Sequence, residues 1–190
     1  KDANKNPPGR RVTTNDYSSA DYYYVNKSSL PKVYGGFNTS LSWKGFDLSA
    51  IFAYSIGGYI YNRDITMILH NGSLEGRDWS TEILKRWTPD NRYTDVPALS
   101  TTSNNWNSAS TRFLQNNSYM RLKNLTLSYN LPKQWISKLS LSSVQVYVQG
   151  DNLFTIHKNQ GLDPEQGITG ITYYRYPAMR TISGGINIAF

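Results

Sequence analysis

Five segments of this chain alternate apolar and polar residues with a period of two, and no other feature constrains the fold as much. The segments are residues 33–43, 46–56, 118–130, 143–152 and 181–190. Successive side chains of a β-strand lie on opposite faces, so this period is typical of strands with one apolar face. Lys44-Gly45, between the first two segments, is typical of a tight turn. The sequence therefore predicts an all-β fold of about five antiparallel strands, the first two forming a hairpin.

The third segment departs from strict alternation near its N-terminal end. Its apolar face is predicted to hold Tyr119, Leu125, Leu127 and Tyr129. Met120 and Leu122 fall in the opposite phase. One extra residue in a strand shifts the phase on one side of it, so we expect a β-bulge within this segment.

The connections between the predicted strands alternate between short and long. Residues 44–45 and 131–140 form short connections, whereas residues 61–117 and 153–179 form long ones. Structureless loops above ~15 residues are uncommon in soluble domains. Short turns on one side and long loops on the other are typical of transmembrane β-barrels, and the strands have the ~9–11 residues that a bilayer requires. We therefore predict transmembrane barrel strands with short periplasmic turns and long extracellular loops.

The two faces of the strands receive different environments in this prediction. Aromatic residues near the strand ends fit the membrane interfaces, where we place Trp43, Phe46 and Phe190. The face predicted to line the barrel lumen holds Asn38, Ser40, Asp47, Ser49, Gln145 and Gln149. Residues 1–32 are then an extracellular segment leading into the barrel, and residues 33–190 are barrel.

A short helix is predicted near residues 80–87, inside the first long connection. Ser80 stands at the N-cap position, and Glu82 lies in the first turn, where a carboxylate is favourable. Pro89 follows and stops the helix.

The composition excludes several classes of protein. The chain has no cysteine, which excludes disulfides, thiolate zinc sites and a cysteine nucleophile. The net charge is +7 at pH 7, but lysine and arginine are spread singly, so we expect no nucleic-acid partner. No apolar run approaches the ~20 residues of a membrane-spanning helix. Residues 1–11 lack the apolar region of a secretory signal, so we expect the chain to begin within a longer protein.

The segment "SYMRLKNLTLSYNLP", which begins at Ser118, resembles a signature of the SusC/RagA-like TonB-dependent outer-membrane transporters of the Bacteroidetes. That signature reads S-Y-x-R-L-K-N-[LIV]-x-L-x-Y-x-[LF]-P. Five further segments fall in the order of the same family: "PKVYGGFNTSLSWKGFDLSAIFAYSIGG", "RWTPDN", "VYVQGDNLF", "GLDPE" and "YPAMRTISGGINIAF". Each segment alone is weakly specific, but six in one order over residues 31–190 are a specific resemblance.

The resemblance implies the C-terminal antiparallel strands of a large transmembrane β-barrel. Barrels of this transporter class have ~22 strands, so the plug domain and the remaining strands are expected outside this chain. The implied partners are a SusD-like surface lipoprotein, TonB acting through the plug, outer-membrane lipid and the rest of the same transporter chain. The implied location is the bacterial outer membrane, with the C-terminus at the periplasmic side and Phe190 as a barrel-assembly signal.

The function that the resemblance implies is nutrient import, and we favour an oligosaccharide as the substrate. A peptide importer of the same family is the first alternative, and a soluble glycan-binding β-sandwich is an alternative from another class. Many relatives carry an acidic D-x-N-G-D-G stretch before the first strand, whereas "KDANKNPPGR" offers only Asp2. We therefore predict neither a metal site nor a cofactor.

The long connections carry the residues that we predict to contact ligand. Aromatic rings stack on the apolar faces of sugars, and six are candidates: Trp79, Trp87, Trp106, Tyr173, Tyr174 and Tyr176. The alternative is that these rings pack the loops against one another or against the partner lipoprotein.

The titratable residues of the loops give no sign of catalysis. His70 and His157 are predicted to be solvated loop residues rather than a shared metal site. Asp163 and Glu165 could do acid–base chemistry, but Asp-Pro-Glu is a turn sequence, and we predict that they lock a loop. No catalytic triad, phosphate loop or HExxH motif is present, so the chain is predicted not to be an enzyme.

Overall fold

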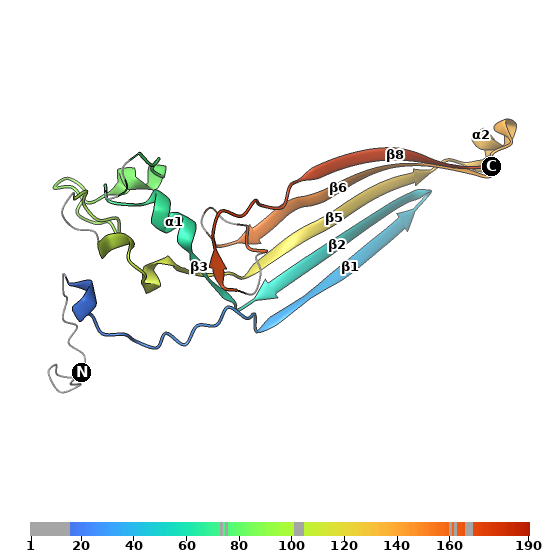
Figure 1. Cartoon of the computed structure of the whole chain (residues 1–190). Coiled ribbons are helices and arrows are strands. Elements are labelled where there is room, and N and C mark those ends of the chain that lie inside the picture. Colours follow the sequence, from blue (N-terminus) through green and yellow to red (C-terminus); the bar gives the residue numbers. More distant parts are fainter. Residues whose placement is uncertain are drawn as a thin grey trace. The chain divides into compact units, whose positions relative to one another are not determined.

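Figure 1 shows a computed structural model of the chain, which describes residues 16–72, 74, 76–100, 105–159, 161, 163–165 and 169–190. The N-terminal stretch around Asp2, where no metal site is predicted, lies outside the described residues. The chain divides into two compact units. The sheet unit comprises Ser28–Ile60, Gln115–Gly170 and Arg175–Phe190, and the loop unit comprises the chain up to Lys27, Tyr61–Leu114 and Ile171–Tyr174.

The sheet unit is built on one antiparallel sheet (Figure 1). Its strands, in spatial order, are β1 (Val33–Trp43), β2 (Phe46–Ile56), β5 (Tyr119–Asn130), β6 (Ser143–His157) and β8 (Thr181–Ala189). All five predicted strands are confirmed. Among the described residues the sheet is open, because β1 and β8 each pair on one side only. Strand β6 runs beyond its predicted end at Asn152, since residues 153–157 include Phe, Thr and Ile, which favour strands, and they pair with β5.

The hairpin of β1 and β2 turns at Lys44 and Gly45, as predicted. Both residues have positive φ, 48° and 88° respectively, and the register joins Trp43 to Phe46. Two successive positive φ values are typical of a type I′ turn, whose twist matches that of the flanking strands. Gly45 adopts this conformation without steric cost, whereas Lys44 does so with some strain.

The predicted β-bulge is present in β5. Its pairing with β2 passes from Leu122 opposite Phe52 to Asn124 opposite Ile51, the next residue of β2. Lys123 is therefore the extra residue on β5, and the phase of the strand changes there.

The bulge decides which side chains of β5 share a face. Leu122 pairs with Phe52 and so lies on the same face as Leu125. Tyr119 pairs with Ser55 and lies on the other face. The prediction that Tyr119 shares the apolar face with Leu125 was wrong, because the phase change falls between them.

One face of the sheet is a continuous apolar surface. Successive rows across the strands contain Leu41, Leu48, Leu127 and Val148, and then Trp43, Phe46, Tyr129, Val146 and Ile186. The rings of Phe46 and Tyr129 have centroids 4.5 Å apart. This face is open, since Leu41 is 66% and Ile182 is 72% exposed. A contiguous exposed apolar surface is typical of sites that contact another protein or a membrane.

The opposite face is polar and is bridged by side-chain hydrogen bonds. One row contains Ser40, Ser49, Thr126, Gln149 and Ser183. The Asp47 carboxylate accepts hydrogen bonds from the Ser42 hydroxyl at 2.5 Å and from the Asn130 amide at 2.7 Å. All six residues predicted to face the lumen lie on this side of the sheet. Their common face is confirmed, and the lumen itself stays a prediction.

The loop unit has a small hydrophobic core of its own. The core residues are Ile65, Leu69, Ile83, Val96 and Phe113. They come from α1 (Arg63–Ile68), η2 (Thr81–Lys85), η4 (Thr111–Phe113) and the segments between them. Helix α1 begins after Asn62, whose side-chain oxygen accepts the N–H of Ile65 at 3.1 Å, and Asp64 lies in its first turn.

The remaining elements are short. They are η1 (Tyr17–Ser19), β3 (Tyr59–Asn62), η3 (Asn105–Asn107), β4 (Leu114–Asn116), α2 (Lys133–Ile136), η5 (Ser137–Leu139) and β7 (Ile171–Thr172). Strands β4, β3 and β7 form a second sheet in that order, and β3 pairs with β7 in parallel. In the described parts of the chain, no helix has the length and apolar character to cross a membrane.

The helix predicted near residues 80–87 is the 3-10 helix η2. The Ser80 hydroxyl accepts the N–H of Glu82 at 3.3 Å, which confirms the predicted N-cap. The helix is shorter than expected because Arg86 already has an extended backbone, with ψ 155°.

Candidate functional site

Arg121 of β5 is the centre of a buried ion-pair network. Its Nη2 lies 2.5 Å from Asp163 Oδ1, and its Nη1 donates to Glu165 Oε2 at 2.8 Å. Its Nε donates to the Thr155 hydroxyl at 2.8 Å. Lys123 adds a second cation, with its Nζ 2.6 Å from Glu165 Oε2. These bonds tie Asp163 and Glu165 to β5, and Arg121 in turn bonds to Thr155 of β6.

The Asp163 carboxylate is the most enclosed acid of this network, with its side chain 6% exposed. Burial alone would raise its pKa. Hydrogen bonds from the backbone N–H groups of Ala178 at 2.6 Å and Glu165 at 2.9 Å, together with Arg121, outweigh burial and lower the pKa of Asp163 below its usual 3.8. A carboxyl group that stays ionised in this way cannot serve as a general acid near neutral pH.

The contacts of Asp163 and Glu165 agree with the prediction that these acids lock a loop. Both are bound to cations of β5, and Asp163 also fixes the backbone at Ala178. The arrangement holds Asp163, Glu165 and the backbone at Ala178, all within the connection between β6 and β8, beside the sheet. It offers no nucleophile activated by a neighbouring base.

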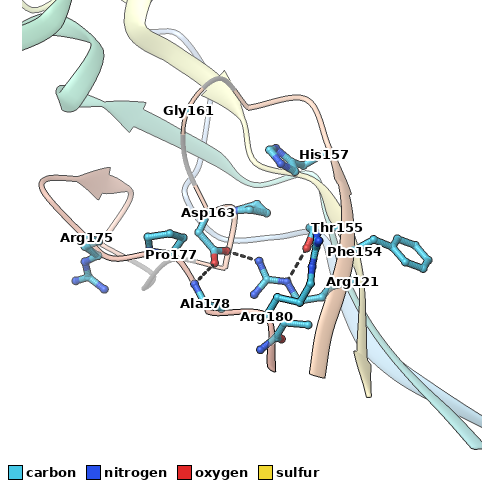
Figure 2. Close-up of a pocket in the computed structure, with 12 residues that line it drawn as sticks. Arg121, Phe154, Thr155, His157, Gly161, Asp163, Arg175, Pro177, Ala178 and Arg180 are labelled. Atoms are coloured by element: carbon cyan, nitrogen blue, oxygen red, sulfur yellow. Dashed lines mark hydrogen bonds and ion pairs between the residues drawn. The ribbon is translucent and has the colours of Figure 1, made fainter. Parts of the chain in front are cut away.

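A hollow of about 490 Å³ opens beside the network, within the sheet unit (Figure 2). Figure 2 shows Arg121 reaching toward Asp163, with His157 on the neighbouring strand. Arg175 and Arg180 also line the hollow. Among the described residues neither of these two arginines forms an ion pair, so the lining carries more positive than negative charge.

A second cluster, in the loop unit, joins two tyrosines to two arginines. We call Arg63, Arg77, Tyr173 and Tyr174 the tyrosine–arginine platform. The centroids of the two tyrosine rings are 4.4 Å apart, and the Arg63 guanidinium lies 4.5 Å from the Tyr173 centroid. Arg77 Nη1 donates to the Tyr174 hydroxyl at 3.1 Å. Tyr173 is 47% and Tyr174 is 61% exposed, so two of the predicted ligand-contacting rings lie together on accessible surface.

The other four predicted aromatic residues differ in their surroundings. Trp79 donates its Nε1–H to His70 Nδ1 at 3.1 Å, and Trp106 packs against the core of the loop unit. Trp87 is 43% and Tyr176 is 94% exposed. Trp79 and Trp106 therefore have structural contacts, while ligand contact stays a prediction for all four.

The two histidines have opposite environments. His70 is 2% exposed, and its Nδ1 accepts hydrogen bonds from the N–H groups of Gly72 and Leu74 and from Trp79. The prediction of a solvated residue was wrong for His70, because it organises the loop around it. His157 is exposed at the end of β6. Within the described ranges, no group of three or more His, Cys, Asp or Glu side chains could hold a metal ion.

Sequence reasoning missed the arginines of both clusters. Arg121 had a usable signal, since a cation stands out in a strand whose neighbours are apolar. Arg63 and Arg77 had none, because their partners Tyr173 and Tyr174 are far away in the chain and meet them only through the fold.

Comparison with curated proteins finds homologues over most of the chain, although no family model matches it. The chain is 33% identical to "TonB-dependent receptor P3" and 31% identical to "TonB-dependent receptor P26", both of Formosa agariphila. It is 28% identical to "TonB-dependent receptor SusC" of Bacteroides thetaiotaomicron. These matches cover 92%, 90% and 88% of the chain but only 18%, 18% and 16% of the relatives, so the chain spans less than a fifth of their length.

Solved structures show that the chain also shares its fold with proteins of known structure. The chain matches the RagAB peptide importer in its "open-open" state with a TM-score of 0.82 and 34% identity, over 97% of this chain and 20% of that one. The "closed-closed" state gives a TM-score of 0.81 and 35% identity, over 96% and 20%. These relatives are named as receptors and importers, in agreement with the prediction that the chain is not an enzyme.

Proposed function

This chain is homologous over most of its length to the TonB-dependent receptors of the SusC/RagA family, and from that premise we propose that it is part of an outer-membrane nutrient importer. Residues 33–190 would form the C-terminal part of the transmembrane barrel, and residues 1–32 an extracellular segment before it. The rest of the transporter chain would supply the other strands and the plug. The C-terminus would lie at the periplasmic side.

The observation that carries this proposal is the two-sided character of the five-stranded sheet. Its apolar face suits lipid, and its hydrogen-bonded polar face suits the lumen of a barrel. A soluble β-sandwich would cover the apolar face with a second sheet. Leu41 and Ile182, at opposite edges of this face, are instead mostly exposed among the described residues, which favours the barrel.

The importer would bind and release its cargo without making or breaking a bond. A SusD-like lipoprotein would capture the nutrient at the surface, and TonB would act on the plug to drive passage. In this scheme the network around Arg121 keeps the external 163–178 connection in place at the rim of the barrel.

We propose an oligosaccharide as the substrate. The exposed rings of Tyr173 and Tyr174 support this choice, because the apolar C–H face of a sugar stacks on an aromatic ring. A peptide is the second candidate, supported by the likeness to the RagAB peptide importer.

Uptake by cells with and without the complete transporter tests the proposal. Loss of the transporter should abolish uptake of fluorescent oligosaccharides and leave peptide uptake unchanged. The reverse pattern would establish the peptide alternative. Recovery of the folded protein from the soluble fraction, as a monomer without detergent, would refute the barrel itself.

A further inference from the structure

We propose that the tyrosine–arginine platform binds an acidic sugar unit, one that carries a carboxylate or a sulfate group. The inference rests on the proposed function and narrows its substrate class from oligosaccharides in general to anionic ones. It draws on the charge, the ring geometry and the backbone of the platform, all within the loop unit.

The platform carries a net positive charge, and its two arginines form no ion pair among the described residues. The Asp64 carboxylate accepts the N–H of Tyr174 at 2.9 Å and the hydroxyl of Thr172 at 3.2 Å, and it sets one negative charge against the two guanidinium groups. Each guanidinium has five N–H donors, and Arg77 is seen to commit one of them to Tyr174. Donors are therefore left for an anionic ligand.

The rings add a surface that suits a sugar. The ring centroids of Tyr173 and Tyr174 are 4.4 Å apart, and the two residues are 47% and 61% exposed. The Arg63 guanidinium lies over the Tyr173 ring, 4.5 Å from its centroid, and this cation–π contact keeps a cation beside the pair of rings. A ring that stacks on a pyranose and a guanidinium that pairs with its carboxylate or sulfate would then act on the same sugar unit. A neutral sugar would leave the guanidinium groups without an anionic partner.

The backbone fixes the second ring in place. Tyr174 has φ 47°, a left-handed conformation that a residue with a side chain rarely adopts. The bonds from its N–H to Asp64 and from Arg77 to its hydroxyl hold it there at both ends. A strained backbone conformation persists where the surrounding contacts enforce it, and such positions are often found at ligand sites. A ring held in advance loses little freedom when a ligand binds.

Calorimetry on the intact transporter with its lipoprotein tests the inference. The probes are trigalacturonate and a sulfated galactotriose, against neutral galactotriose of the same length. We expect at least one acidic probe to bind about tenfold or more tightly than the neutral one, which corresponds to about 1.4 kcal/mol. The double variant Arg63→Gln/Arg77→Gln should lose that preference and bind the acidic and neutral probes with equal affinity.

A matched variant controls for the loss of net charge. Lys85→Gln/Arg92→Gln removes two cations from exposed positions of the same unit and should keep the preference for acidic sugar. A ring variant, Tyr173→Leu/Tyr174→Leu, should weaken acidic and neutral probes alike. Hydrogen exchange in α1 checks that each variant keeps the loop unit folded.

Three results would overturn the inference. They are equal affinity for the acidic and neutral probes, an unchanged preference in the Arg63→Gln/Arg77→Gln variant, and tighter binding of triglutamate than of either acidic sugar. The last result would assign the platform to acidic peptides. Binding of neutral oligosaccharides without any charge preference would leave the proposed function standing. Failure of every oligosaccharide to bind or enter would instead remove the oligosaccharide function itself.

Discussion

Replacing Arg121 by methionine should release the 163–178 connection from the sheet. The substitution keeps a long apolar stem in β5 but removes the cation that holds Asp163 and Glu165. The side chains of Arg121 and Asp163 are 4% and 6% exposed, so the change leaves a carboxylate buried without its cation. Breaking a buried pair in this way typically costs about 3–5 kcal/mol.

The structure places the expected cost at the lower end of that range. Asp163 keeps two backbone N–H donors, from Glu165 and Ala178, and Glu165 keeps Lys123. We therefore expect about 3 kcal/mol, or about a hundredfold rise in the opening of the connection, at 1.4 kcal/mol per tenfold.

Hydrogen exchange, measured by mass spectrometry on the transporter in detergent, reports how often the connection opens. The amides of Glu165 and Ala178 report it directly, because both donate to Asp163. Lys123→Met is the matched control, since it removes the neighbouring cation from the same network. Its pair with Glu165 is about one-third exposed on each side, 33% and 36%, so we expect a loss of only about 0.2–1 kcal/mol.

Two results would refute the reasoning. One is equal exchange at Ala178 in the Arg121→Met and Lys123→Met variants. The other is unchanged exchange of the Glu165 and Ala178 amides in the Arg121→Met variant, because a buried carboxylate that loses its cation should destabilise the connection.

The other predictions address the core, the hairpin turn, acidity and assembly. Phe113→Ala truncates a ring that is 1% exposed and should cost about 3–5 kcal/mol, measured as lost exchange protection in α1. Gly45→Ala, at φ 88°, should cost about 1–2 kcal/mol in thermal unfolding, whereas Lys44→Gly should cost none. The pKa of Asp163 is lower in the fold than its usual 3.8, so its stabilisation is complete above about pH 5 and is lost as the pH falls through the folded pKa. Exchange around Asp163, corrected for its intrinsic rate, should then be constant from pH 5 to 8 and rise below about pH 4. Deleting Phe190 from the full protein should lower its amount in the outer-membrane fraction on an immunoblot, and an unchanged amount would contradict the role of Phe190 in assembly.

The strands could be predicted from the sequence because their signal is local. Backbone geometry puts alternate side chains on opposite faces, so a strand with one apolar face carries its own pattern. The ends of β1 and β2 follow from that pattern and from the turn at Lys44-Gly45. The bulge in β5 was visible as a break in phase, but its position at Lys123 was not. The predicted face of Tyr119 was therefore wrong, since one extra residue in a strand moves every side chain beyond it to the opposite face.

The contacts of the loop residues were harder to predict from the sequence than the strands were. Asp163 and Glu165 could be recognised as a turn that locks a loop, because Asp-Pro-Glu has strong local preferences. The burial of His70 could not be foreseen, since it depends on three donors that the folded loop brings to one nitrogen.

The sequence by itself determined the five antiparallel strands, their two contrasting faces and the family, because all three depend on local pattern and short motifs. The tertiary structure alone decided which loop residues meet. Tyr174 lies 97 positions from Arg77 and 110 from Asp64, yet both hold it in place. Contacts at such separations arise from how the loop segments pack, and no local preference of the residues involved specifies a partner so far along the chain.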